Sequence, residues 1–145
     1  MKTLKRFAAL GLLVALASGC EVFEDPTPET VSFRMDGPAG VTVTVLYSKQ
    51  FVAGVTEAGI TEVEIFRADT VVHTLPIDTL IDVRLERRIF IQAEVQPTDT
   101  VNVDVRVDVN DRNVFARNGD LFPALPWQFV YQYNTRFTES IQVII

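Results

Sequence analysis

The chain has 145 residues, with 19 acidic side chains against 13 basic ones and a net charge of −6 at pH 7. This length suits one domain, and the acidic balance argues against nucleic-acid binding, because no basic stripe is present to neutralise phosphates. The chain contains one cysteine, which excludes an intrachain disulfide, so a hydrophobic core alone must stabilise the fold.

The first nineteen residues have the three parts of a secretory signal. Three basic residues are followed by the apolar run 7–17, which is shorter than the roughly 20 residues that a bilayer-spanning helix needs. The segment Leu16-Ala17-Ser18-Gly19-Cys20 then resembles the lipobox of bacterial lipoproteins, although Ala17 stands where that motif usually has Leu. The alternative is an ordinary signal peptide that happens to be followed by a cysteine.

The lipobox resemblance implies a lipid anchor. In such proteins the cysteine thiol, here that of Cys20, receives a diacylglyceryl group, the signal peptide 1–19 is removed, and the new amine is acylated. The mature chain would keep ten basic and nineteen acidic residues, a net charge of −9, so we expect an anionic bilayer to repel it. Glu21 after the cysteine is similar to lipoproteins bound to the outer membrane. The expected location is therefore the bacterial cell envelope, with the domain in the periplasm or at the cell surface.

Residues 20–29 are predicted to form a tether between the lipid and the domain. Two prolines stiffen the segment, four acidic residues keep it solvated, and an extended form would span about 30 Å. The domain is predicted to cover residues 30–145.

From Thr30 onward the apolar residues alternate with polar ones, which is typical of half-buried strands. In chain order, the alternating segments are 30–35, 41–45, 61–66, 83–95, 101–110 and 141–145, and turn signals such as 36–40 and 118–120 separate them. We expect an all-β fold: one antiparallel β-sandwich of seven or eight strands, immunoglobulin-like in general form. A small closed barrel is the alternative. The last segment predicts that the chain end is held in a sheet.

Three segments also resemble MmpS-type transport accessory proteins. These are residues 31–47 (VSFRMDGPAGVTVTVLY), Thr74-Leu75-Pro76 and residues 90–108 (FIQAEVQPTDTVNVDVRVD). The resemblance implies a small membrane-anchored β-sandwich that works beside a lipid or drug exporter. Ile77 follows the Leu-Pro pair, where that family commonly has Trp.

Few residues suggest chemistry. His73 is the only histidine, and no nucleophile or metal-ligand pattern accompanies it, so a structural hydrogen bond is the expected role. Residues 108–113 are rich in oxygen ligands, but they lack the glycine and glutamate of an EF-hand, and a turn between strands fits them better. We therefore predict that the protein is not an enzyme and that it holds no cofactor or metal.

Aromatic residues crowd the segment from Leu121 to Phe137, where two prolines predict that the part before Trp127 is a loop. Large aromatic side chains on a loop are typical of contact residues, although they could instead close one end of the core. Arg87 interrupts an apolar alternation and lies at a bend or reaches an anionic partner. The candidate partner-binding residues are Phe122, Trp127, Phe129, Tyr131, Tyr133 and Arg87.

These features predict a non-catalytic, lipid-anchored accessory or structural subunit of a larger membrane protein complex. One alternative is a ligand-binding lipoprotein for a hydrophobic molecule or a carbohydrate, and another is an MmpS-like transport accessory protein. We expect the partners to be the membrane, through the N-terminal lipid, and an envelope protein.

Overall fold

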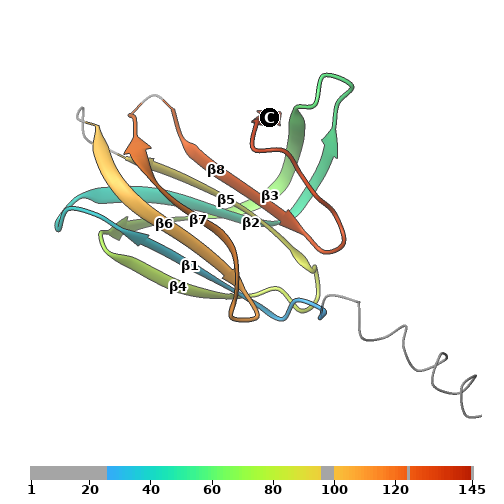
Figure 1. Ribbon diagram of the computed structural model, residues 1–145, viewed down its shortest axis with the longest axis horizontal. Coiled ribbons are helices and arrows are strands. Elements are labelled where there is room, and N and C mark those ends of the chain that lie inside the picture. Colours follow the sequence, from blue (N-terminus) through green and yellow to red (C-terminus); the bar gives the residue numbers. More distant parts are fainter. Residues whose placement is uncertain (1–25, 96–99, 124, 145) are drawn as a thin grey trace, which may run out of the picture.

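The computed structural model describes residues 26–95, 100–123 and 125–144. In these residues the protein forms nine strands, arranged as two sheets that pack face to face (Figure 1). The strands are β1 (Thr30–Asp36), β2 (Thr42–Val55), β3 (Thr61–Thr74), β4 (Ile77–Asp82), β5 (Arg88–Val95), β6 (Val101–Val109), β7 (Arg112–Leu121), β8 (Trp127–Gln132) and β9 (Ile141–Ile144). No described helix is long and apolar enough to cross a membrane.

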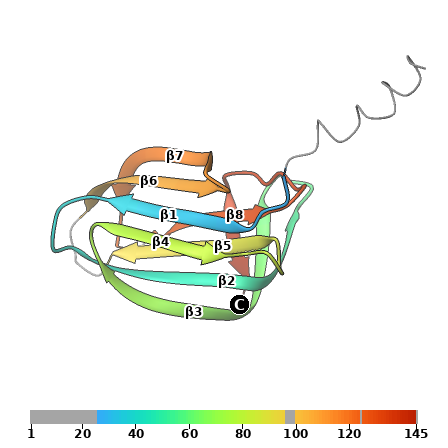
Figure 2. The ribbon, with the colours of Figure 1, turned by 90° about the horizontal axis from the view of Figure 1, so that it is seen from below.

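One sheet has the strand order β4-β1-β6-β7 and the other has the order β8-β5-β2-β3-β9 (Figure 2). The predicted all-β sandwich is thus confirmed. Three details differ from the prediction. The described residues contain nine strands rather than seven or eight, and β9 pairs with β3 in a parallel sense. Residues 118–120, predicted as a turn, lie inside β7, where they pair with residues 102–104 of β6. Because β9 pairs with the first residues of β3, the end of the chain is held in a sheet as predicted.

The segment 83–95, predicted as one alternating run, is divided by a turn. β4 ends at Asp82 and β5 begins at Arg88. Arg87 has a left-handed backbone (φ 53°), and its N–H donates to the Val83 carbonyl at 2.7 Å. Leu85 lies in this turn and is 90% exposed. The bend expected at Arg87 is thus confirmed, although the turn preserves the spacing of the apolar residues on either side of it.

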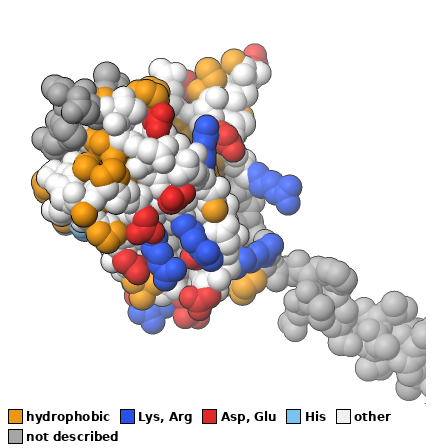
Figure 3. Space-filling view, turned by 60° about the vertical axis from the view of Figure 1, so that its left-hand side comes forward, with side chains coloured by type: hydrophobic (Ala, Val, Ile, Leu, Met, Phe, Trp, Pro, Cys, Tyr) orange, Lys and Arg blue, Asp and Glu red, His pale blue; other side chains and the backbone are white. Residues whose placement is uncertain are grey.

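The outer face of the four-stranded sheet carries paired polar side chains. Arg106 Nε donates to both carboxylate oxygens of Asp108 at 2.9 Å, and Asn118 Nδ2 donates to Asp104 at 2.9 Å. Figure 3 shows acidic and basic side chains lying next to one another on one face of the molecule. These contacts explain the polar positions of the alternating strands, which need water or polar partners.

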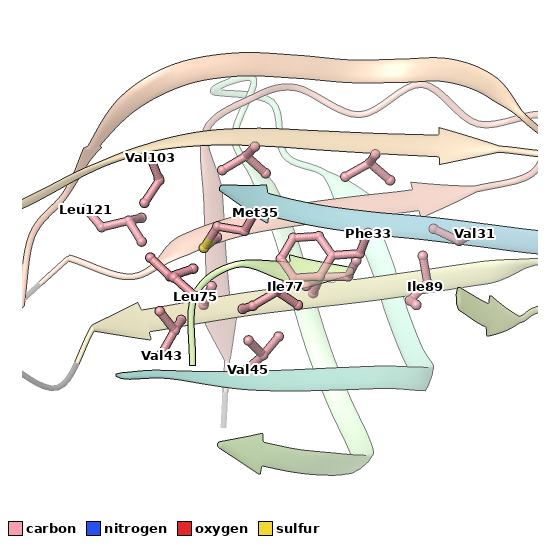
Figure 4. Packing of buried hydrophobic residues seen from close by; sticks show 14 of the residues in the cluster. Val31, Phe33, Met35, Val43, Val45, Leu75, Ile77, Ile89, Val103 and Leu121 are labelled. Carbon is pink, nitrogen blue, oxygen red and sulfur yellow. The ribbon is translucent and has the colours of Figure 1, made fainter. Parts of the chain in front are cut away.

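The main core lies between the sheets and is built from the apolar positions that the alternation predicts (Figure 4). Val31, Phe33 and Met35 of β1 have no exposed surface, and they meet Val43 and Val45 of β2. Burying side chains of this size contributes about 1.5–3 kcal/mol each. With no disulfide available, this apolar contact holds the two sheets together.

A second, smaller cluster lies on the other side of the five-stranded sheet. β2 has a register shift between Tyr47 and Phe51, which changes the face that its later residues present. Phe51 therefore packs in a cluster with Val63, Phe90 and Val130 instead of in the main core. Phe137 and the apolar residues of β9 cover this cluster.

Candidate functional site

A hollow of about 730 Å³, here called the edge groove, runs along the outer edge of β8. Residues from both faces of β8 line it: Trp127, Phe129 and Tyr131 from the inner face, and Gln128 and Val130 from the outer face. Successive strand residues point to opposite sides of a sheet, so one hollow meets both sets only along the strand edge. β8 and β7 are the end strands of their sheets, and among the described strands each has one neighbour.

The aromatic side chains of β8 that face inward are anchored in the core. Phe33 of β1 stacks on the Trp127 ring with centroids 5.7 Å apart and planes at 19°. Phe115 of β7 lies 5.6 Å from Trp127 and 5.7 Å from Phe129, measured between centroids. The aromatic residues therefore close the open side of the sandwich and form the floor of the edge groove at the same time.

The opposite wall belongs to the inward positions of β7, which pair with buried valines of β6. Gly119 has no side chain, and a Cβ there would meet only Arg117 Nε, at 4.0 Å, so the wall is open at this point. Arg117 Nη1 lies 4.0 Å from Glu139 Oε2, which joins β7 to the segment after β8. Both side chains are mostly exposed, and such a pair contributes little stability.

The connection between β7 and β8 forms the rim of the edge groove. β7 ends at Leu121 and β8 begins at Trp127, so the predicted loop before Trp127 is confirmed. The Leu125 N–H donates to the Phe122 carbonyl at 3.1 Å in a turn. Phe122 is 46% exposed and Leu125 is 66% exposed, so the rim presents apolar surface to solvent.

The structure divides the candidate partner-binding residues between two places. Phe122, Trp127, Phe129 and Tyr131 line the edge groove. Tyr133 and Arg87 lie beyond the other end of β8, where the Tyr133 N–H donates to the Arg87 carbonyl at 3.0 Å. The predicted lipidation site, Cys20, is outside the described residues.

His73 makes a structural contact. Its Nε2 lies 3.3 Å from the Tyr47 hydroxyl, and the two rings meet edge to face. Burial raises the pKa of Tyr47, and a hydrogen bond with Thr79 partly opposes that rise. The phenol is therefore held in its neutral, hydrogen-bonding form.

The oxygen-rich segment 108–113 is a tight turn, as predicted. Asn110 and Asp111 have positive φ angles of 47° and 64° and connect β6 to β7. The Asn110 side chain accepts from the N–H groups of Glu29 and Thr30 and donates to the Thr27 carbonyl. No group of three or more acidic, histidine or cysteine residues suited to a metal occurs in the part of the chain that the structure describes.

Sequence reasoning did not identify Phe115 or Arg117 as groove residues, whereas Leu125 lies in the aromatic-rich segment 121–137 that it singled out. The turn at Asn110-Asp111 alone would have placed Val114 opposite Val107, and the register shift between Val107 and Asp108, which puts Phe115 there instead, has no local sequence signal. The chain matches no protein-family model, and no curated protein is significantly similar to it.

Proposed function

We propose that the protein is a non-catalytic, lipid-anchored accessory subunit of the bacterial envelope that binds an extended segment of a partner protein in the edge groove. The observation that carries this proposal is that one hollow meets both faces of an end strand. Such a hollow has room for a further strand. The proposal includes an immunoglobulin-like arrangement of the two sheets. An MmpS-like transport accessory protein, working beside a lipid or drug exporter, is an alternative to it.

Strand addition explains the composition of the groove. An added strand gains affinity from main-chain hydrogen bonds and specificity from alternate side chains. Along β8, one set of partner side chains would meet Trp127 and Phe129, and the other set would meet Val130 and Phe137. The matching partner is a segment of about six residues with apolar side chains on both faces, which is the length of β8 itself.

The proposed anchor keeps the groove near its partner. Asn110 holds the chain at Thr27, so seven residue steps separate Cys20 from the domain. Seven residues span about 25 Å at most. A lipid on Cys20 would thus confine the domain to the membrane surface, where envelope complexes lie.

A second candidate is a ligand-binding lipoprotein for a hydrophobic molecule or a carbohydrate. It is favoured by the position of Trp127 in a hollow rather than on a flat surface. The groove volume of about 730 Å³ also falls within the usual range of small-molecule sites. The two candidates predict different companions after extraction from the membrane: a partner protein for the first and a bound small molecule for the second.

The test replaces apolar residues of the rim. Phe122→Ser with Leu125→Ser removes exposed side chains while leaving the core aromatic residues in place. The matched control is Phe66→Ser with Leu80→Ser, since these residues are 64% and 70% exposed and do not line the groove. The measurement is gentle detergent extraction of native membranes, followed by mass spectrometry of the native complexes.

We expect the rim variant to lose its protein partner and the control variant to keep it, because the apolar contact at the rim is absent only in the first. A partner that remains on the rim variant would contradict strand addition in the groove. Migration of the unaltered protein as a monomer with a bound small molecule would instead support the second candidate.

A further inference from the structure

Basic side chains gather at the end of the molecule where the described chain begins. β1 starts there beside the ends of β4 and β6, since Thr30 pairs with Asp82 and Val31 pairs with Val109. The turn 83–87, the start of β7 and the segment after β8 lie at the same end. Among the described residues, the basic residues of this end are Lys49, Arg84, Arg87, Arg88, Arg112 and Arg136, and the acidic ones are Glu29, Asp82, Glu86 and Asp111; the tether that leads to this end adds Glu21, Glu24 and Asp25, which lie outside the described residues. We call this region the basic end.

Two exposed cations of this end, Arg87 and Arg136, form no ion pair among the described residues. Arg84 pairs with Asp82, and Lys49 lies 3.8 Å from Glu86. Arg87 and Arg136 are exposed, and their guanidinium groups contact no carboxylate of the described residues within ion-pair distance. They are therefore available to an external anion.

The turn 83–87 combines a backbone held by hydrogen bonds with an exposed apolar side chain. Two backbone hydrogen bonds fix Arg87: its N–H donates to Val83, and its carbonyl accepts from Tyr133. Leu85 projects from this turn and is 90% exposed. An exposed apolar side chain close in sequence to Arg84 and Arg87 is a combination that suits an interface between water and anionic lipid.

The net charge of the whole chain does not describe the local charge of the basic end. The chain as a whole carries −6, which by itself predicts repulsion from an anionic bilayer. The opposite end of the four-stranded sheet holds acidic residues, including Asp36, Asp104 and Asp120. Since the screening length at physiological salt is about 8 Å, a surface at the basic end interacts mainly with the charges of that end.

We propose that the basic end docks on the phosphate headgroups of an anionic lipid bilayer, with Leu85 entering the interface. This proposal rests on the lipid anchor at Cys20 that the proposed function includes. The position of Thr27 and the seven residue steps back to Cys20 support a lipid surface as the occupant, because an anchored chain brings this end within about 25 Å of the bilayer.

Docking in this way orients the edge groove. β8 runs from Trp127, next to the rim, to Gln132, which pairs with Arg88 at the basic end. The rim residues Phe122 and Leu125 therefore face away from the membrane. A partner segment can enter the groove from that side while the basic end stays on the lipid.

The test uses the membrane-extracted protein in nanodiscs of phosphatidylcholine, with and without phosphatidylglycerol. If Cys20 carries no acyl group, its thiol, the only one in the chain, is coupled to a maleimide phospholipid in the same nanodiscs. A failure of lipoprotein processing is thereby distinguished from a failure of docking. The readout is amide hydrogen exchange in residues 83–88 and 110–113.

We expect slower exchange in both segments on nanodiscs that contain phosphatidylglycerol, and loss of the difference in about 1 M salt, where screening is nearly complete. Arg87→Asn with Arg136→Asn should abolish the difference; Asn tolerates the left-handed backbone of Arg87. The matched control, Ala39→Glu with Ala58→Glu, lowers the net charge equally in two exposed loops and should keep the difference.

Equal exchange on the two lipid compositions would overturn the proposal, as would equal losses in the arginine variant and the control. Protection that occurs in native membranes but on neither nanodisc would also overturn it and would assign the basic end to an acidic protein.

Discussion

One side chain, that of Asn110, joins parts of the chain that lie far apart in the sequence. It binds the backbone N–H groups of Glu29 and Thr30 at 2.8 and 3.2 Å and the Thr27 carbonyl at 2.8 Å. The sequence predicts a turn at Asn110, because Asn and Asp tolerate positive φ. It does not predict the bonds to residues 27–30, since they depend on how β1 and β6 pair. The predicted tether 20–29 is thus fixed to the domain from Thr27 onward.

Asp108 supplies a prediction for pH dependence. Burial raises the pKa of Asp108, but hydrogen bonds from Arg106 and Asn113 outweigh burial, so the pKa lies below its usual range. A carboxyl with a lowered pKa in the folded state stabilises the fold above its unfolded pKa of about 3.9, and this stabilisation is lost as pH falls through the folded pKa. We expect the free energy of unfolding to fall below about pH 4, and Asp108→Asn should remove part of that fall.

Urea unfolding between pH 2 and 7 measures this effect. The exposed Asp82, whose pKa Arg84 lowers to about 2, acts in the same direction in both proteins and so cancels in the comparison. Identical pH profiles for the two proteins would contradict the role given to the Arg106–Asp108 contact.

At the scale of elements, β8 has two roles: it closes the core and it forms the edge groove. Its inward residues touch Phe33 and Phe115, while its outward residue Val130 belongs to the second cluster. The alternation of apolar and polar residues predicts most strands, because a strand with one buried face places an apolar residue at every second position. The sequence predicts the bend at Arg87, which the structure confirms, but it does not predict the bulge in β2, because that bulge changes strand parity without a distinct local signal.

Trp127 separates the two roles of β8. We expect Trp127→Ala to lower the free energy of unfolding by about 2–4 kcal/mol, because the ring is half-buried and stacks on Phe33. Phe122→Ser, at the exposed rim, should change it by less than about 1 kcal/mol. Chemical denaturation of both variants measures the difference, and equal stabilities would show that Trp127 does not close the core.

At the scale of the whole molecule, the structure has two ends of different character. The rim of the edge groove, with Phe122 and Leu125, is apolar and lies at one end of β8. The basic end, with Arg87 and Arg136, lies at the other. Composition gives only the average of these regions, so net charge and apolar content could not predict where either lies. Under the two proposals made above, their separation would let the protein contact a membrane and a protein partner at once.

Binding of a partner strand in the edge groove is tested by photo-crosslinking in native membranes. A photoreactive phenylalanine analogue is placed at position 122, with position 66 as the control. We expect position 122 to crosslink to one extended segment of a protein partner with apolar side chains on both faces, and position 66 to give no such crosslink. Crosslinks from position 122 to lipid or small molecules alone, or the same products from both positions, would contradict strand addition in the edge groove.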